Sequence, residues 1–168
     1  MKKITVVLFC VSLFLPVIAF PSLASGAPAH EGGTSFKDVE GKEWILSEVK
    51  SAGKTVHMDR KKLEAENMGG VYTINFKKEE ASNEGRVSGM GAPNRYFGPY
   101  TSGSNRSLSL GNMASTMMMA FREPEGLKEN EYFSFLSRVT RWDLRNGKLE
   151  LYCSGSAGGE AILIYTLK

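Results

Sequence analysis

Cysteine and histidine are scarce in this chain of 168 residues, which has two of each. Two cysteines are too few for a disulfide scaffold, and two histidines disfavour most zinc sites and hydrolase triads. The 6 prolines and 18 glycines are too few and too aperiodic for a collagen-like chain. Basic and acidic residues number 21 and 18, a balance that excludes a highly charged disordered tail. The composition is that of one ordinary globular domain, either all-β or α+β.

One long apolar run lies near the N-terminus, from Val6 to Phe20, and two lysines precede it. Ser22 and Ala24 place small residues at the two positions that signal peptidase reads. The run is shorter than the roughly 20 residues of a membrane span. We therefore expect residues 1–24 to be a signal peptide, cleaved after Ala24 or Gly26. Cys10 has no lipobox behind it, so we expect an exported mature form, periplasmic or secreted, that neither spans a membrane nor carries a lipid anchor.

Cleavage of this signal changes the charge and the cysteine count. It leaves 19 basic and 18 acidic residues, a formal net charge of +1. The longest basic run is then Arg60-Lys61-Lys62, too little cationic surface for nucleic acid, so we expect no nucleic-acid partner. Cys153 is left as the sole cysteine, and its place in an alternating apolar segment predicts burial. We expect a monomer without a disulfide.

The remaining sequence is a series of short, alternating apolar segments between turn signals. We expect residues 25–40 to be a flexible leader and residues 41–168 to be the folded domain. Asn146-Gly147 is typical of a two-residue hairpin turn, and the glycine-rich stretch Gly89–Gly103 predicts a loop. The expected strands are Trp44–Val49, Thr55–Met58, Val71–Phe76, Arg86–Gly89, Ser107–Leu110, Thr140–Leu144, Leu149–Cys153 and Ala161–Leu167.

Two helices are expected among these strands. Lys61–Asn67 predicts a short one, and Glu125–Val139, with Pro124 just ahead of it, predicts a long one. No βαβ alternation is present, so about seven or eight strands should form an antiparallel barrel or sandwich. The side chains expected to line its interior are Tyr72, Ile74, Phe76, Leu108, Phe135 and Leu163.

Candidate catalytic residues are few. His30 lies in the expected leader and His57 in an expected strand, and neither has a partner at ligand spacing. Ser47 and Lys50 match S-x-x-K, but the strand pattern turns them to opposite sides and the later S-D-N and K-T-G elements are missing. The pairs Glu129 with Glu131 and Asp143 with Glu150 are expected on solvated faces. We therefore expect no catalytic residue, metal site or cofactor, and a protein that is not an enzyme.

Two further segments have alternative interpretations. Ser154–Gly159 is rich in glycine but lacks the spacing of a phosphate-binding loop, and it precedes a strand, so we expect a hairpin loop. Met117–Met119, with Met113 nearby, could in an exported protein capture Cu(I) through thioether sulfur. Methionine also fills irregular gaps in cores, and we expect this run to line the core.

Several blocks of residues follow one another in a family-specific order. They are W-x-L from Trp44, N-x-Y-x-G-x-Y from Asn94, T-x-M from Thr116 and E-x-x-Y-x-x-x-L from Glu129. Together they resemble the META domain, the family of the heat-shock protein HslJ, over about residues 41–168. The matching residues are Trp44, Gly89, Asn94, Tyr96, Gly98, Tyr100, Thr116, Met118, Glu129, Tyr132, Leu136 and Trp142.

The resemblance implies a mainly β fold: an antiparallel, conical, partly open β-barrel with one helix packed across it. It also implies a family disulfide, whose two cysteine positions are Pro93 and Ala120 here. Without that bridge, the Gly89–Tyr100 loop must be held by packing of its aromatic residues.

The resemblance also bears on function. META domains are bacterial envelope proteins and some protozoan virulence-associated proteins, with no established catalytic residues. Their fold resembles lipid-binding pilot proteins of secretion systems. We therefore expect a non-enzymatic, exported envelope protein, a binding or stress-related module for an apolar ligand or an envelope protein. The alternative is a pilot-like secretion-assembly or interaction factor without a ligand cavity. Its contact surface would be an exposed aromatic loop of Tyr96, Phe97 and Tyr100.

Overall fold

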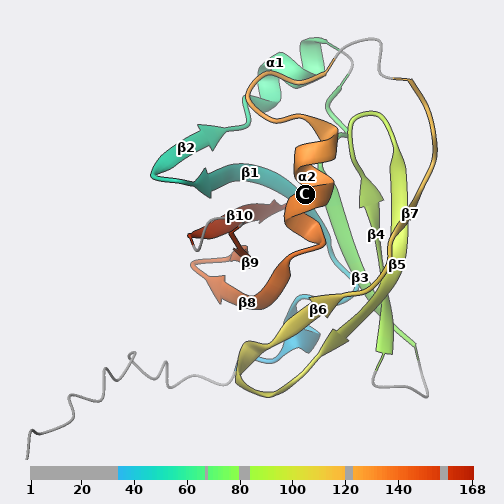
Figure 1. Cartoon of the computed structure of the whole chain (residues 1–168), viewed down its shortest axis with the longest axis vertical. Coiled ribbons are helices and arrows are strands. Elements are labelled where there is room, and N and C mark those ends of the chain that lie inside the picture. The colour runs from blue at the N-terminus through green and yellow to red at the C-terminus, as the bar shows by residue number, and fades with distance from the viewer. Residues whose placement is uncertain (1–33, 67, 80–83, 120–122, 156–158) are drawn as a thin grey trace, which may run out of the picture. The chain divides into compact units, whose positions relative to one another are not determined.

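Within the residues that the computed structural model describes, ten antiparallel strands form one sheet that curls into a nearly closed barrel (Figure 1). These residues are 34–66, 68–79, 84–119, 123–155 and 159–168. The strands are β1 (Glu43–Ser51), β2 (Lys54–His57), β3 (Thr73–Lys78), β4 (Glu84–Met90), β5 (Arg95–Ser102), β6 (Leu108–Leu110), β7 (Ala114–Ser115), β8 (Val139–Arg145), β9 (Lys148–Ser154) and β10 (Glu160–Leu167).

The barrel follows the strand order β6-β5-β4-β3-β1-β10-β9-β8, while β2 pairs with β1 and β7 pairs with β5. Its two end strands, β6 and β8, face each other across a seam bridged between Ser107 and Arg141. The helices are α1 (Arg60–Ala65) and α2 (Glu129–Leu136), with 3-10 turns η1 (Phe36–Asp38) and η2 (Ser104–Arg106). The expected fold class, a mainly β, antiparallel, partly open barrel of about seven or eight strands with one longer helix, is confirmed: eight strands form the barrel, and it is nearly closed. The expected signal peptide and His30 lie outside the described residues. Among the described residues, no helix is long and apolar enough to cross a membrane.

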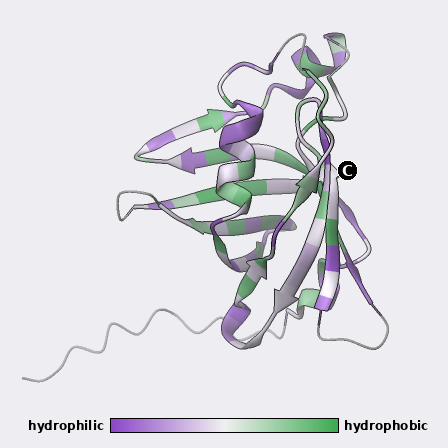
Figure 2. Cartoon of the chain, turned by 45° about the vertical axis from the view of Figure 1, so that its right-hand side comes forward, coloured by the Kyte–Doolittle hydropathy of each residue, from purple (hydrophilic) through white to green (hydrophobic). Residues whose placement is uncertain are grey.

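Apolar and polar residues alternate along several strands (Figure 2). Because successive side chains of a strand point to opposite faces, this alternation determines which ones face the interior. Ile74 and Phe76 of β3 are fully buried. The other side chains expected inside are buried too: Tyr72, Leu108, Leu163 and Phe135. The turn between β8 and β9 has positive φ at both Asn146 and Gly147, which confirms the predicted hairpin. Strand β10 pairs with β1 on one side and β9 on the other, which explains its continuous apolar sequence.

The glycine-rich stretch predicted as a loop is largely strand β5. Tyr96, Gly98 and Tyr100 point inward and alternate with exposed residues. On one side of β5, the partner strand changes from β7 to β6 at Pro99. No backbone N–H is required there for pairing with either strand, so a proline is tolerated. The proline and glycine content therefore concealed a period-two pattern.

Helix α2 is shorter than predicted at both ends. Gly126 has a φ of +84°, and Lys128, the N-cap, is extended, so residues 125–128 are not helical and the helix begins at Glu129. Leu127 is buried although it precedes the helix, which is why the apolar spacing placed it inside. Val139 already belongs to β8. Helix α1, capped by Asp59, agrees with the predicted short helix to within two residues.

The folded part begins before residue 41, so the expected leader boundary is too late. Phe36 packs its ring against those of Phe76, Tyr100 and Trp142, with centroid distances of 5.1, 5.4 and 5.0 Å. Val39 is fully buried, and its carbonyl accepts a hydrogen bond from the indole nitrogen of Trp44. Residues 36–39 therefore close one end of the barrel.

This contact yields a prediction about stability. Phe36→Ala should lower the free energy of unfolding by about 3 kcal/mol, because it removes a buried ring from an aromatic cluster. Urea denaturation followed by tryptophan fluorescence measures the change. Lys37→Ala, at an exposed position of the same turn, is the control and should change the stability little. Equal stabilities of the two variants would show that the N-terminal turn does not contribute to the fold.

Candidate functional site

Four residues that match the META pattern come together where β5, the segment after β7 and helix α2 meet: Asn94, Thr116, Met118 and Glu129. Oε1 of Glu129 accepts hydrogen bonds from the backbone nitrogens of Ala92 (2.5 Å) and Asn94 (2.7 Å), and Oε2 accepts one from Nδ2 of Asn94 (2.6 Å). Oδ1 of Asn94 accepts from the backbone nitrogen of Met118 (2.7 Å) and Oγ1 of Thr116 (2.9 Å). We call this group of hydrogen bonds the Asn94–Glu129 clamp.

The clamp uses every hydrogen-bonding position of the Asn94 amide, because Nδ2 also donates to the carbonyl of Met118 (3.2 Å). Glu129 is the first residue of α2, where the helix dipole favours a negative charge. The prediction that Glu129 lies on a solvated face is therefore wrong, whereas Glu131 is exposed as expected. A Cβ at Gly91 would lie 2.5 Å from Oε1 of Glu129, so the backbone approaches the carboxylate only because glycine is there.

A network of tyrosine hydroxyls continues from the clamp into the interior. The hydroxyl of Tyr96 donates to the carbonyl of Thr73 (2.8 Å) and lies 3.1 Å from that of Tyr132, which accepts from Tyr165 (3.1 Å). Burial raises the pKa of Tyr132 to about 12 and holds the pKa values of Tyr96 and Tyr165 well above their ordinary value. These phenols stay neutral at physiological pH, so the network joins strands rather than supplying a base.

Arg60 covers the same end of the barrel. Its guanidinium donates hydrogen bonds to the carbonyls of Leu46 and Val71, and burial lowers its pKa. The hydroxyl of Tyr72 donates to the carbonyl of Leu127 (2.6 Å), which ties the turn before α2 to the start of β3. These polar groups are used to close the barrel end.

A buried carboxylate, that of Asp143, holds the seam between β6 and β8. Asp143 accepts hydrogen bonds from Arg106, from Nε of Arg145 (2.6 Å) and from the backbone nitrogen of Leu144 (2.7 Å). The guanidinium of Arg106 also lies over the ring of Trp142, 5.9 Å from its centroid. The prediction that Asp143 is solvated is wrong, because the two arginines compensate its burial.

The other sequence candidates do not converge. His57 is exposed on β2, and the hydroxyl of Ser47 donates to the carbonyl of Ile164 rather than to Lys50. No group of three or more His, Cys, Asp or Glu residues that could hold a metal ion occurs in the described part of the chain. The Ser154–Gly159 segment connects β9 to β10, and residues 156–158 lie outside the described set.

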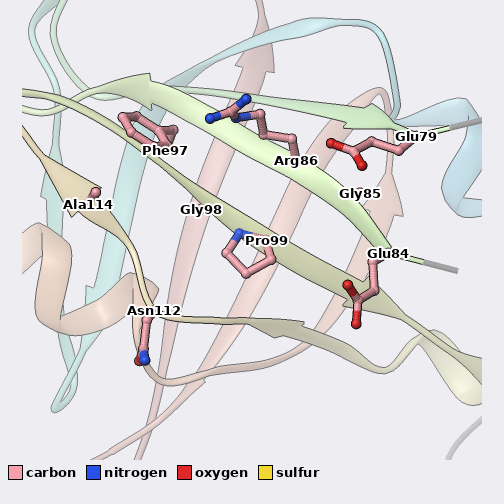
Figure 3. Close-up of a pocket in the computed structure, with 9 residues that line it drawn as sticks. All are labelled: Glu79, Glu84, Gly85, Arg86, Phe97, Gly98, Pro99, Asn112 and Ala114. Carbon is pink, nitrogen blue, oxygen red and sulfur yellow. The ribbon is translucent and has the colours of Figure 1, made fainter. Parts of the chain in front are cut away.

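The outer face of β4 and β5 is hollowed. A hollow of about 360 Å³ is lined by Arg86, Phe97 and Glu84, among others, and Figure 3 shows Arg86 and Phe97 close together on neighbouring strands. The guanidinium of Arg86 lies 4.8 Å from the centroid of the Phe97 ring. A second hollow, of about 550 Å³, shares these two residues.

Two predictions about exposed and buried side chains are corrected here. Tyr96 and Tyr100 are each 1% exposed, so of the three residues of the expected aromatic surface only Phe97 reaches solvent. The run Met117–Met119 does not line the core, because all three side chains are exposed. It follows β7, and its course is held by Asn94 through the backbone of Met118. The Cu(I) alternative stays a prediction.

The clamp predicts that replacing Glu129 and replacing Glu131, two carboxylates of the same helix turn, will have different effects on the stability of the fold. Glu129→Gln should lower the free energy of unfolding by about 1–3 kcal/mol, because a new amide donor would face the donors of Ala92 and Asn94. Glu131→Gln removes the same charge from an exposed position and should have a much smaller effect. Urea denaturation of both variants measures the difference. Similar losses would show that only the charge at the helix N-terminus matters.

The burial of Cys153 predicts an unreactive thiol. Desolvation raises its pKa from 9.0 to about 12, so at pH 8 a disulfide reagent should react slowly with the folded mature protein and rapidly with one thiol in urea. By linkage, this shift stabilises the fold below pH 9.0, and the contribution disappears as the pH rises toward 12. Thiol titration of folded and unfolded protein checks this. Rapid reaction of the folded form would contradict the burial.

Comparison with known proteins places this geometry in a family. An NMR structure of a protein from Burkholderia xenovorans has a TM-score of 0.56 and 20% identity, covering 84% of this chain and 99% of that chain. A crystal structure of a DUF4847 family protein from Bacteroides vulgatus has a TM-score of 0.48 and 12% identity, covering 77% and 94%. A search of curated proteins found no match. The sequence model of the META domain matches residues 37–164, and the chain therefore belongs to the META domain family.

Proposed function

We propose that this META-domain chain is a non-enzymatic, exported binding module of the bacterial envelope that contacts its partner through the outer surface of the barrel. The observation that carries this proposal is the filled interior. Phe36, Phe76, Tyr100 and Trp142 pack at one end of the barrel, and at the other end the hydroxyls of Tyr96, Tyr132 and Tyr165 form one network. An apolar ligand inside the barrel would have to displace these side chains, so the interaction alternative is favoured over the ligand-carrier one.

The outer face of β4 and β5 supports this choice of surface. The two hollows there adjoin at Arg86 and Phe97, and Phe97 remains 45% exposed although its ring is large and apolar. Exposed apolar groups rimmed by polar ones mark interaction sites. The surface differs from the aromatic loop first expected, because it is the outer side of a strand and has one aromatic side chain.

The use of the polar groups supports a non-enzymatic role. The carboxylates of Glu129 and Asp143 are occupied by structural hydrogen bonds, and the hydroxyls of Tyr96, Tyr132 and Tyr165 bind one another or backbone carbonyls. A catalytic site requires such groups to converge on a cleft, with hydrogen-bonding positions left free for a substrate. Export is supported by the n-region, apolar run and small residues of positions 1–24.

One experiment tests both parts of the proposal. The full chain is expressed in bacteria, the protein is isolated from the periplasmic and membrane fractions, and its mass is measured by native mass spectrometry. We expect the bare mass of a chain that begins at Ser25 or Ala27, because aromatic side chains occupy both ends of the barrel interior. A stoichiometric lipid adduct would contradict the outer-surface proposal. An uncleaved chain found in the cytosol would contradict export.

A further inference from the structure

Most exposed large hydrophobic side chains of the described residues lie on β5 and on the segment that follows its partner strand β7. Of the five in the described residues, four lie in two adjoining segments: Phe97 (45% exposed) on β5, and Met117 (100%), Met118 (60%) and Met119 (96%) after β7. We call these four residues the methionine patch. The two segments are joined by a hydrogen bond from the backbone nitrogen of Thr116 to the carbonyl of Arg95 (3.0 Å) and by the side chain of Asn94. A cluster of this kind is uncommon on a soluble domain without an interaction partner.

The methionine side chains protrude, although the backbone beneath them is held. Asn94 bonds both the nitrogen and the carbonyl of Met118, so the run has a fixed position. Exposures of 100% and 96% mean that Met117 and Met119 touch almost nothing of the protein, so they form no wall of a pocket. Protruding, unbranched apolar side chains suit a soft medium that closes around them, such as the interface of a bilayer.

The cations of this face lie beside Phe97 and at the start of β5, whereas the carboxylate that the contacts place nearest Met118, that of Glu129, is bound by Ala92 and Asn94. Lys77 and Arg86 are register partners on β3 and β4, and like charges in such a pair repel each other. Neither they nor Arg95 have an ion pair within the described ranges. Of the nearby carboxylates, Glu43 is bound to Lys168, and Figure 3 places Glu79 and Glu84 at the end of the hollow away from Phe97.

From these observations we propose that the methionine patch docks on an anionic lipid bilayer. Met117, Met118 and Met119 insert between the headgroups, while Arg86 and Arg95 lie against the lipid phosphates. The apolar side chains and the unpaired cations together match the two attractions that hold proteins at membrane surfaces. This inference rests on the proposed outer-surface function and names its partner as a lipid surface.

Vesicle co-sedimentation of the mature protein, isolated from cells that express the full chain, tests the proposal. The probes are vesicles of phosphatidylcholine alone and of phosphatidylcholine mixed with phosphatidylglycerol. We expect the protein to bind the mixed vesicles, and this binding should weaken as the salt concentration rises. Binding to the neutral vesicles should be weaker. The triple variant M117S/M118S/M119S should reduce the partition coefficient by about tenfold or more. Because these side chains are exposed, its thermal unfolding should match that of the wild type.

Leu167→Ser is the matched control, since it removes the one large exposed hydrophobic side chain of the described residues outside the patch, and it should bind like the wild type. The double variant R86Q/R95Q should bind the mixed vesicles more weakly, and its binding should depend less on the salt concentration. Unchanged binding by the triple variant, or equal binding to both vesicle types, would overturn the proposal. A wild type that binds no vesicle but cross-links from Met118 to an envelope protein would overturn it too. In that case, a bare mass in native mass spectrometry would still support the proposed outer-surface function.

Discussion

The carboxylate of Glu129 is the point on which the arrangement of this domain depends. It accepts hydrogen bonds from a turn 35 residues earlier in the chain, and through Asn94 it is joined to the segment of Thr116 and Met118. Helix α2 has only eight residues, too few to be stable without tertiary contacts. Once the helix is fixed by its first residue, Tyr132 reaches the hydroxyls of Tyr96 and Tyr165 in the barrel interior. The clamp thus determines both the position of the helix and the filling of the core.

The same contacts bear on the disulfide that the family resemblance implies and that this chain lacks. The positions of the two family cysteines, Pro93 and Ala120, flank the clamp, one before Asn94 and one after Met118. The side chain of Asn94 makes three hydrogen bonds to Thr116 and Met118, so it joins the segments that the bridge would join. At about 1 kcal/mol per hydrogen bond, these bonds are comparable to the roughly 2–4 kcal/mol of a typical disulfide. Hydrogen bonding therefore offers a physical substitute for the covalent link.

Most of the barrel was predictable from local patterns, because strand alternation and hairpin turns depend on neighbouring residues. Ile74 and Phe76 were assigned to the interior on this basis, and the Asn146-Gly147 turn was found from its dipeptide. Strand β5 was missed because Gly98 and Pro99 indicate a loop when the change of its neighbouring strands is unknown. The burial of Asp143 could not be predicted, since one of its two compensating arginines, Arg106, is 37 residues away and reaches it only in the closed barrel. Long-range polar pairs leave no periodic signal in a sequence.

The inside and the outside of the domain are connected through Asn94. Its side chain binds the backbone of Met118 and so holds the exposed methionines, while its backbone nitrogen and its amide group bind the carboxylate that positions α2. Aromatic side chains occupy the barrel interior at both ends, and the clamp that positions Tyr132 there also fixes the course of the outer segment. In this META domain the signature residues Asn94, Thr116 and Glu129 therefore fix the course of the segment that carries the exposed methionines as well as the position of α2.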